Sequence, residues 1–455
     1  MIRRYANYIR KNIIRLPNFI NYFILNINQN PTMIYGIDYQ RYKKYLNKSD
    51  TTFNSELHLL NVVNSAIQTV PYYRRLYRGM TFKDINQFSK CFGFIDKDIV
   101  MINMKDFISD KVKIADYDFG TTGGTSGKPL QLIAPKTRYI IEFATIHSIW
   151  ERIGYKFNVR AVIRNHRLPK RVIYKINPLM REVIFDGFRL NDNYFQDVYK
   201  TIRRLNIAFI HCYPSVAYEF SVYLLKNRLD VSFIKAFLCS SENIFDYQLD
   251  LVQNRLGIRF FNFYGHSEKL VLAGFCAKSD LYHIEPTYGY FELVDTEGNG
   301  IKQVGDIGEI VGTSFHNPGM PLIRYRTGDF AEYVGDICPV CHRRVPVIKN
   351  IMGRWRGDRI FNRDGSFVTT TALNLHDELY SVIYGLQYVQ KEKGILQILI
   401  IKSPLYNSMH EEILYKHYKD KLNKDTKIEI KYVDELIKQP NGKFLLLISK
   451  VSSTN

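Results

Sequence analysis

The sequence of 455 residues lacks an uninterrupted apolar run long enough to span a bilayer, which takes roughly 18 to 20 residues. Residues 1–30 lack the compact apolar block and the small-residue cleavage site of a secretory signal peptide. Six cysteines are too few for a disulfide scaffold in a chain of this length. The sequence also contains no internal repeat and no low-complexity linker. These absences, with an ordinary globular composition, predict a cytoplasmic protein.

Positive charge is what the sequence has in excess, with a formal net charge of +19. Such a surface attracts anions: nucleotides, nucleic acids, acidic lipids or acidic sugars. A general enrichment in Ile, Asn, Lys and Tyr is the alternative, because it raises the lysine count without selecting a partner. A basic run between Arg160 and Lys175, which includes Arg164 and Arg167, is typical of a solvated face, with contact to nucleic acid or an acidic polymer as the alternative.

The first thirty residues hold five basic residues and no acidic one, and their apolar residues recur at helical spacing. This pattern predicts a helix that either lies on an anionic membrane surface or packs against its own domain.

Strand-like and helix-like segments alternate from about residue 90 to residue 320. The alternation predicts α/β layers with a largely parallel sheet. Gly-rich turns between 288 and 333 indicate a small β subdomain. The strand-like runs are 159–163, 207–212, 234–239 and 260–264, and the helical segments are 139–153, 215–227 and 246–256.

A second unit begins after Gly353. A hairpin over 381–390 and 395–402, a helix near 410–422 and a strand near 427–433 predict a compact α+β domain. We therefore place a large N-terminal domain at residues 1–352 and a small, mobile C-terminal domain at 353–455.

A glycine- and hydroxyl-rich segment, Phe119-Gly-Thr-Thr-Gly-Gly-Thr-Ser-Gly-Lys-Pro129, is suited to polyphosphate. Glycines let backbone amides approach the phosphates, hydroxyls donate hydrogen bonds, and a lysine adds a point charge. Three residues separate Gly123 from Gly127, one fewer than in a Walker A loop, and proline occupies the position of its Mg²⁺-binding Ser or Thr. A plain flexible loop is the alternative. The candidate phosphate-binding residues are Thr122, Gly123, Gly124, Thr125, Ser126, Gly127 and Lys128.

This segment resembles the phosphate loop of the adenylate-forming (acyl-CoA synthetase) superfamily. Together with the Leu130-Gln-Leu that follows, it is similar to the phenylacetate–CoA ligase branch, which includes coenzyme F390 synthetase-like and CapK-type capsule-biosynthesis proteins. Three further segments resemble the family in its order, so that the resemblance covers about residues 90 to 450. It implies a large layered α/β domain that binds AMP and a small C-terminal domain.

The second segment, Phe263-Tyr-Gly-His-Ser-Glu268, is similar to the family pattern Tyr-Gly-x-Thr/Ser-Glu. The resemblance implies that Tyr264, followed by Gly265, stacks on adenine, that Ser267 contacts the α-phosphate and that Glu268 holds Mg²⁺. An aromatic face suits a base, and a carboxylate suits a hard cation. A surface acid after a strand is the alternative for Glu268.

The third segment, Arg324-Tyr-Arg-Thr-Gly-Asp329, is similar to the family's Tyr-Arg-Thr-Gly-Asp. The resemblance places Arg326 at the nucleotide and gives Asp329 both ribose hydroxyls, which the two oxygens of a carboxylate can accept. A plain turn is the alternative. Residues 240–243 resemble the adenine-side loop, and a strand end near residue 212 resembles the border of the acyl pocket. These resemblances add Ser241 and Glu242 to the nucleotide site, and Tyr213 and Pro214 to the substrate pocket. We also assign His266, in the Tyr-Gly-His-Ser-Glu segment, to the substrate pocket.

The fourth segment, Gln439-Pro-Asn-Gly-Lys443, resembles the motif whose lysine reaches the forming acyl-adenylate. A cation there would offset charge in the transition state, although Asn-Gly-Lys alone is a common hairpin turn. The family hinge reads Gly-Arg-x-Asp-Asp, whereas residues 353–358 read Gly-Arg-Trp-Arg-Gly-Asp. This segment lacks the first Asp and is one residue longer. The resemblance makes Arg354 the nucleotide-facing arginine and Asp358 the hinge candidate.

Cys338-Pro-Val-Cys341 has the two-residue spacing that lets two thiolates face one metal ion. Cys276 and His283 can complete a closed, structural zinc site within residues 276–341, an arrangement that resembles several members of the phenylacetate–CoA ligase branch. His342 is an alternative to His283, and unligated cysteines in a β subdomain are the alternative to a metal.

The combined interpretation is an ATP-dependent ligase that activates a carboxylic acid as an acyl-adenylate. We expect ATP, Mg²⁺ and a structural Zn²⁺, with CoA or an amine or hydroxyl of a cell-surface sugar as acceptor, in capsule or cell-surface polysaccharide biosynthesis. Peripheral contact at the inner face of the membrane would occur through the basic N-terminus. A catalytically impaired nucleotide-binding scaffold of the same fold is one alternative. A basic nucleic-acid-binding protein is the other, but the ordered ATP motifs argue against a nucleic-acid partner.

Overall fold

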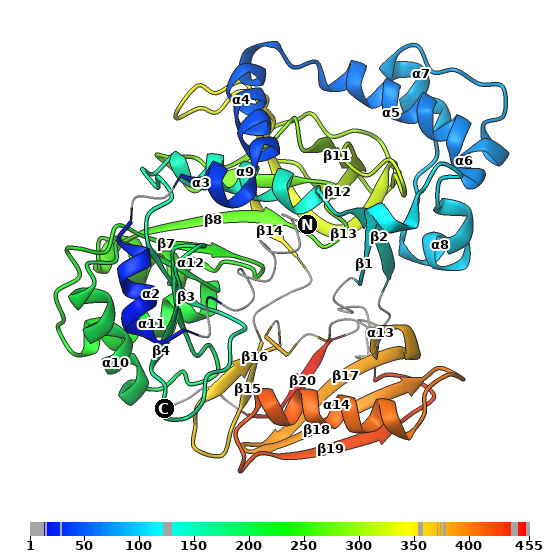
Figure 1. Ribbon diagram of the computed structural model, residues 1–455. Coiled ribbons are helices and arrows are strands. Elements are labelled where there is room, and N and C mark those ends of the chain that lie inside the picture. Colours follow the sequence, from blue (N-terminus) through cyan, green and yellow to red (C-terminus); the bar gives the residue numbers. More distant parts are fainter. Residues whose placement is uncertain are drawn as a thin grey trace.

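A computed structural model describes residues 13, 16–27, 30–121, 130–353, 358–370, 372, 373, 375, 379–437 and 445–451. Its largest element is a twelve-stranded mixed sheet with the order β11-β12-β13-β14-β10-β9-β8-β7-β6-β3-β5-β4. Figure 1 shows this sheet in the upper and left parts of the molecule and the C-terminal elements below it.

The parallel half of the sheet contains the strand-like runs that the sequence predicts. They are β3 (Arg160–Ile163), β6 (Phe209–Cys212), β7 (Ala236–Ser240) and β8 (Arg259–Gly265), joined in parallel by β5 (Glu182–Phe185). These strands are almost entirely apolar because layers of other elements cover them, as in buried parallel sheets generally. The α/β fold with a parallel sheet is thus confirmed.

The predicted helices of this half are also present. They are α9 (Arg138–Glu151) and α11 (Pro214–Lys226), with α10 (Asp192–Arg204) preceding β6. The third predicted helix, over 246–256, is a short α12 (Asp246–Leu249) that continues as the π-helical turn η3 (Asp250–Arg255).

The antiparallel half continues the same sheet beyond β8. The strands of the predicted β region lie at its edge, so the metal-ligand candidates and the nucleotide motifs share one sheet. In spatial order this half comprises β9 (Leu272–Phe275), β10 (Tyr282–Ile284), β14 (Val347–Met352), β13 (Tyr325–Gly335), β12 (Ile307–Ser314) and β11 (Gly289–Val294). At the opposite edge, β4 (Tyr174–Asn177) pairs antiparallel with β5.

Helices precede the sheet in the chain, and Figure 1 shows α4 to α7 in the upper part of the molecule and α8 below them on the right. After them a hairpin of β1 (Tyr117–Thr121) and β2 (Gln131–Pro135) flanks residues 122–129, which lie outside the described residues. No helix among the described residues is both long and apolar enough to cross a bilayer. The helices are α2 (Asn18–Leu25), α3 (Pro31–Tyr35), α4 (Ile37–Thr52), α5 (Ser55–Thr69), α6 (Pro71–Leu76), α7 (Ile85–Cys91) and α8 (Lys97–Ile102), followed by η1 (Met104–Phe107) and η2 (Ile114–Asp116).

The C-terminal part forms its own small sheets. A two-stranded pair, β15 (Arg359–Phe361) and β16 (Phe367–Thr369), precedes α13 (Leu379–Val382) and a four-stranded sheet in the order β19-β18-β17-β20. The predicted hairpin is β17 (Ile383–Glu392) with β18 (Ile395–Lys402), and the predicted helix and strand are α14 (Ser408–Lys421) and β19 (Lys427–Tyr432). The last strand, β20 (Leu447–Ser449), pairs in parallel with β17.

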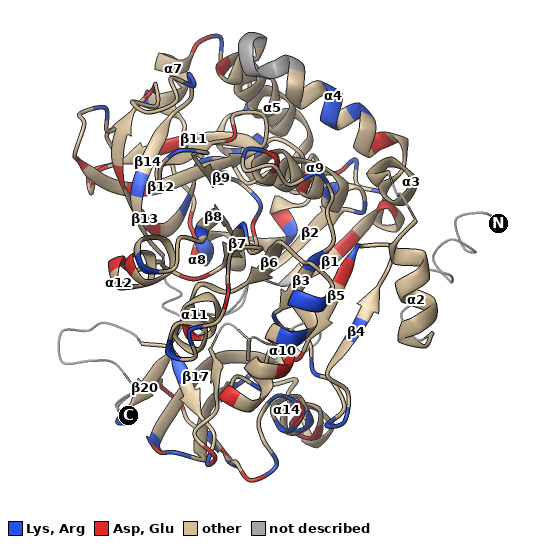
Figure 2. Ribbon diagram, turned by 90° about the vertical axis from the view of Figure 1, so that its left-hand side faces the viewer, with Lys and Arg blue, Asp and Glu red and all other residues tan. Residues whose placement is uncertain are grey.

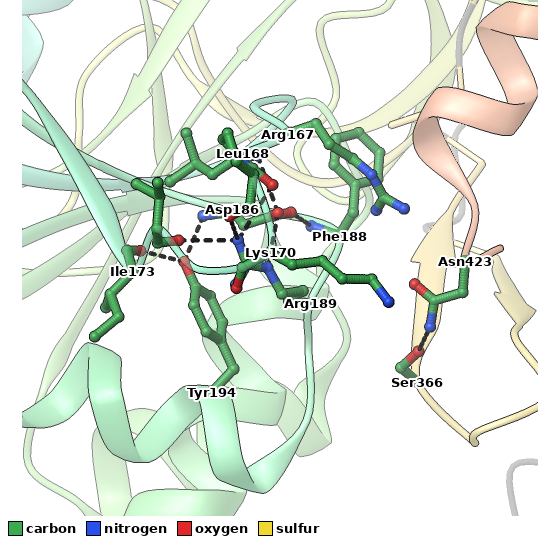
Figure 3. Close-up of polar contacts among 12 residues, drawn as sticks. Arg167, Leu168, Lys170, Ile173, Asp186, Phe188, Arg189, Tyr194, Ser366 and Asn423 are labelled. Atoms are coloured by element: carbon green, nitrogen blue, oxygen red, sulfur yellow. Dashed lines mark hydrogen bonds and ion pairs between the residues drawn. The ribbon is translucent and has the colours of Figure 1, made fainter.

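The C-terminal part packs against the β4–β5 end of the large sheet. Leu190 and Phe367 form an isolated antiparallel bridge, and the Arg359 guanidinium lies 2.6 Å from the Glu219 carboxylate. Arg167 donates a hydrogen bond to the Leu422 carbonyl at 2.6 Å, and Figure 3 shows it beside Ser366 and Asn423. Part of the basic run thus makes contacts between the two parts of the chain, which favours a structural role over contact with nucleic acid.

Basic and acidic residues are mixed on the surface as well. Figure 2 shows both signs of charge along α10 and α14. This mixing argues further against a nucleic-acid-binding protein, because such a protein presents its cations on one face.

Candidate active site

A cavity of about 830 Å³ lies where the parallel strands end, and side chains from the following loops line it. Parallel strands present their carboxyl ends at one edge, which is where open α/β sheets bind ligands. The cavity brings together nine of the residues singled out in the sequence: Tyr213, Ser241, Glu242, Tyr264, Gly265, His266, Ser267, Glu268 and Asp329.

Tyr264 at the end of β8 and Asp329 on β13 meet at this cavity. The Tyr264 hydroxyl donates a hydrogen bond to Asp329 Oδ2 at 2.9 Å. Burial, and then the Asp329 carboxylate, raise the pKa of Tyr264 well above its ordinary value. The Asp329 N–H donates to Thr327 Oγ1 at 3.1 Å, which fixes the backbone that carries this carboxylate. The Asp329 carboxylate, held by Tyr264, can therefore accept hydrogen bonds from the hydroxyls of a ribose.

Glu268 is oriented by two neighbours. The Val271 N–H donates to Nε2 of His266 at 3.2 Å, so that nitrogen is unprotonated and Nδ1 of a neutral ring carries the proton. Nδ1 lies 3.2 Å from Glu268 Oε2 and donates to it, and the Tyr325 hydroxyl donates to Oε1 at 3.3 Å. His266, predicted to line the substrate pocket, therefore also holds the carboxylate that is the Mg²⁺ candidate.

The loop after β7 connects the cavity to the start of the hinge segment. The side-chain amide of Asn243 donates to the Gly353 carbonyl at 3.0 Å, and its oxygen accepts from the Gly353 N–H at 2.9 Å. A Cβ atom at residue 353 would stand 3.2 Å from Asn243 Oδ1, so the close approach favours glycine. In the same loop, Glu242 accepts from the Ser215 N–H at 3.1 Å at the start of α11.

The four predicted metal ligands lie together beside the antiparallel strands. Cys276 follows β9, His283 is on β10, and Cys338 and Cys341 are in the loop between β13 and β14. One ligand atom from each lies within 4.8 Å of the others, and Cys341 Sγ is 3.7 Å from His283 Nε2. Tetrahedral zinc, with Zn–S near 2.3 Å and Zn–N near 2.0 Å, separates sulfur and nitrogen ligands by about 3.5 Å. The donor set and its spacing fit zinc.

The thiols of this cluster have perturbed acidities. Burial alone would raise the pKa of Cys276, but the Lys278 N–H, the Ser279 hydroxyl and the other two cysteines lower it below its ordinary value. Burial raises the pKa of Cys341. His342, the alternative ligand, is not part of the cluster.

Known proteins resemble this chain in sequence and in fold. Residues 360–450 match the family described as the CapK C-terminal domain. The chain is 22% identical over 438 residues to Protein CapK of Staphylococcus aureus. The aligned region covers 92% of this chain and 90% of that protein.

Solved structures share the fold. A crystal structure of 2-hydroxyisobutyryl-CoA ligase with 2-HIB-AMP and CoA, in the thioesterification state, has a TM-score of 0.56 at 16% identity, covering 93% of this chain and 94% of that one. An open conformation of the same ligase has a TM-score of 0.53 at 15% identity, covering 86% and 90%. The chain has the fold of adenylate-forming ligases, and its C-terminal part is similar to the CapK C-terminal domain.

Other predicted residues lie elsewhere in this adenylate-forming fold. Arg326 does not line the cavity, because its Nε donates to Glu309 Oε2 at 2.7 Å. Pro214 begins α11 and is buried without lining the cavity, and Asp358 immediately precedes β15. Thr122 to Lys128, Arg354 and Lys443 lie outside the described residues.

Arg164 is a cavity residue that the sequence did not single out as a site. Its Nη1 lies 2.6 Å from His211 Nε2 and 3.2 Å from Ser240 Oγ, and its Nη2 lies 3.1 Å from Ser241 Oγ. Its guanidinium also stands over the Tyr213 ring, 4.5 Å from the centroid. Its position directly after a predicted strand was the available signal, since that is where α/β sheets place ligand-binding residues.

Proposed function

We propose that this protein activates a carboxylic acid as an acyl-adenylate and then transfers the acyl group to an acceptor. The convergence of Tyr264, Glu268 and Asp329 on one cavity in the adenylate-forming fold supports this proposal. In the proposed site, Asp329 accepts hydrogen bonds from the ribose, Tyr264 lies against adenine, and the segment 122–128 binds the phosphates. Mg²⁺, when bound at Glu268, would neutralise phosphate charge.

The proposed reaction has two steps. A carboxylate oxygen of the acid attacks the α-phosphorus of ATP, the bond to the bridging oxygen breaks, and pyrophosphate leaves. The thiol, amine or hydroxyl of the acceptor then attacks the acyl carbon, gives up its proton, and AMP leaves. Lys443 would face the negative charge that builds up in the first step, where a preorganised charge is worth most.

Acid-dependent exchange of labelled pyrophosphate into ATP tests this function, because exchange requires the first step to be reversible at the site. Aryl, amino and sugar acids are screened in turn. We expect exchange with one class and none without acid. ATP binding without exchange for any class would instead indicate a nucleotide-binding scaffold.

For the acceptor we propose CoA first, since the solved ligase with the same fold is bound to CoA and an acyl-AMP. An amine or hydroxyl of a cell-surface sugar is the second candidate, which the resemblance of the sequence motifs to CapK-type capsule-biosynthesis proteins implies. Trapping the adenylate and adding CoA, amino sugars or neutral sugars separately distinguishes them by which one releases AMP.

We propose a structural zinc ion at Cys276, His283, Cys338 and Cys341. Four protein ligands would close the coordination shell and leave no position for substrate. Such an ion would hold the loop between β13 and β14 against β9 and β10, and so support the strand that carries Asp329.

We also propose peripheral contact with an anionic membrane through the N-terminal region. In α2 the polar side faces inward: Asn18 donates to the Tyr174 carbonyl at 2.9 Å and Asn21 donates to the Ile176 carbonyl at 3.2 Å, both on the edge strand β4. The outward side presents Phe19 and Phe23, each 74% exposed. Exposed aromatic residues next to a basic segment are typical of interfacial helices.

Flotation with vesicles tests the membrane proposal. The wild type should float with phosphatidylglycerol vesicles but not with phosphatidylcholine vesicles, and the F19S/F23S double variant should lose this binding. Ile102→Ser, at an exposed apolar residue of α8, is the control. Equal flotation of the wild type and the double variant would refute the role of α2.

A further inference from the structure

Arg164 is a cationic side chain of the cavity whose hydrogen-bond partners in the structure are all neutral. These partners are His211, Ser240 and Ser241, and its guanidinium stacks on Tyr213. Among the described residues, no carboxylate lies within ion-pair distance of it. Its neighbour in the cavity wall, Arg160, differs, because it pairs with Glu182 at 2.5 Å.

The carboxylates of the cavity wall are engaged by other groups. Glu142 is paired with Lys269, and Glu182 with Arg160. Glu242 accepts a hydrogen bond from the Ser215 N–H. Glu268 accepts from His266 and Tyr325, and Asp329 accepts from Tyr264. The charge of Arg164 is therefore left for a ligand, and a guanidinium that is partly desolvated in a cavity attracts an anion strongly.

Arg164 lies between two predicted parts of the cavity. On the acyl side it stacks on Tyr213 and contacts His211, and on the adenine side it contacts Ser240 and Ser241. Its partner His211 stacks edge-on against Trp150, with ring centroids 5.2 Å apart. Apolar side chains form much of the cavity wall: Phe143, Ile146, Trp150, Val162, Met180 and Leu272. A carbon skeleton can pack against Tyr213 and Trp150 near Arg164, which favours an anion of the acid over an anion of ATP as its ligand.

The backbone around Arg164 is held before any ligand binds. A Cβ atom on Gly187 would stand only 1.6 Å from the Arg164 carbonyl oxygen, so that glycine permits a close contact between two loops. The buried Asp186 carboxylate accepts from the Leu168 N–H at 3.0 Å and from the Phe188 N–H at 2.9 Å, as Figure 3 shows. Preorganised cations lose little entropy when they bind an anion.

We propose that the acid activated here carries a second carboxylate, which Arg164 binds beside Tyr213 and His211. This proposal rests on the proposed ligase function and names its substrate class as dicarboxylic acids, including acidic sugars with two carboxylates. One carboxylate attacks ATP while the other pairs with the guanidinium. The neutral partners of Arg164 orient the guanidinium without cancelling its charge.

Paired substrates test the proposal. Succinate, glutarate and adipate are each compared with the corresponding monoamide in pyrophosphate exchange, using the wild type, Arg164→Gln and Arg164→Lys. Charged hydrogen bonds contribute roughly 1.5–3 kcal/mol, so the wild type should prefer the best diacid over its monoamide by about 10- to 100-fold in kcat/KM. Arg164→Gln should remove this preference with little effect on the monoamide, and Arg164→Lys should retain part of it. Arg171→Gln, at an exposed residue of the same basic run, should change nothing.

Two measurements separate this proposal from its alternatives. The affinity for ATP should be the same in the wild type and Arg164→Gln, and a loss of that affinity would assign Arg164 to the nucleotide and overturn the proposal. Absence of exchange with every acid would contradict the ligase function but would not test the role of Arg164. Calorimetry of glutarate binding in the presence of AMP tests that role separately, because it measures the affinity of the pocket for a diacid without any reaction. Equal glutarate affinity for the wild type and Arg164→Gln, or no diacid preference in the wild type, would overturn the proposal.

Discussion

Asn243 binds both backbone groups of Gly353, through hydrogen bonds of 3.0 Å to the carbonyl oxygen and 2.9 Å from the N–H. The loop on the adenine side of the cavity is thereby joined to the last described residue before the predicted hinge. Asn243→Ala leaves two backbone groups without these partners, and we expect it to lower the free energy of unfolding by about 1–3 kcal/mol. Urea unfolding measures this change.

The control is Asn254→Ala, whose side chain bonds Asp250 on an exposed surface. Surface changes of this kind are usually within about 0.5 kcal/mol. If the two variants lose a similar amount of unfolding free energy, the hydrogen bonds between Asn243 and Gly353 contribute little to stability.

Asp329→Ala and Glu268→Gln should have different effects on the nucleotide site. Asp329→Ala removes the carboxylate expected to hold the ribose, so we predict that ATP affinity falls by about 10- to 100-fold. Glu268→Gln keeps the shape but loses the charge that suits Mg²⁺. It should bind ATP nearly normally and lower pyrophosphate exchange by about 10²-fold or more. Calorimetry measures ATP affinity and the exchange assay measures adenylation, with Asp306→Ala, at an exposed acidic residue, as the control. Unchanged affinity and unchanged exchange in both site variants would show that Asp329 and Glu268 are not part of the site.

Sequence periodicity was sufficient for much of the fold. The strands β3, β6, β7 and β8 are apolar because both faces are buried, and short apolar runs separated by helical segments indicate this arrangement directly. Periodicity does not reveal which strands become neighbours. The continuous sheet, with the β region of residues 288–333 at its edge, depends on β9 and β10 pairing between β8 and β14, which involves residues far apart in the chain.

The candidate site also contains some residues that the sequence could identify and others that it could not. Cys276, His283, Cys338 and Cys341 could be grouped from the sequence because few residue types bind zinc and their spacing is restrictive. Arg326 and Arg164 could not be told apart as site residues, because an arginine reaches several ångströms and its partner decides its direction. Glu309 draws Arg326 away from the cavity, whereas Arg164 finds only neutral partners beside it.

Removal of zinc should destabilise the protein. If the cluster holds zinc, metal analysis should find about one ion per chain, and Cys338→Ser should lower both the zinc content and the melting temperature. Treatment of the wild type with a chelator should produce a similar loss of stability. Cys91→Ser, at an exposed cysteine outside the cluster, is the matched control. Wild-type protein purified without chelator that contains no zinc, together with a harmless Cys338→Ser, would contradict the proposal.

Stability should fall in acid partly because of Glu285, which lies buried between Arg152 and Arg343. Burial raises its pKa, but these two guanidinium groups outweigh burial and hold the pKa at about 2, against an ordinary value of 4.5. A lowered folded-state pKa contributes stability in full above pH 4.5, and this contribution is lost as the pH falls from 4.5 towards 2. Glu285→Gln takes up no proton, so its unfolding free energy should depend less on pH in this window than that of the wild type. The exposed Glu297→Gln should follow the wild type, and parallel pH profiles for all three proteins would refute the assignment.

Lys443 should be needed for adenylation and little else. The family resemblance places it at the forming acyl-adenylate, where negative charge develops on the attacking carboxylate and on the α-phosphate, and loss of one preorganised charge contact typically costs about 10²–10³ in rate. Lys443→Ala should therefore lose adenylation by roughly that factor but still consume a pre-made acyl-adenylate. Single-turnover kinetics of the two steps, with Lys424→Ala as a control lysine in the C-terminal part, measure both rates. Equal loss in the two steps would indicate a shared structural defect. No loss in either step would mean that Lys443 has no catalytic role. The positive charge that this mechanism requires would then come from another residue.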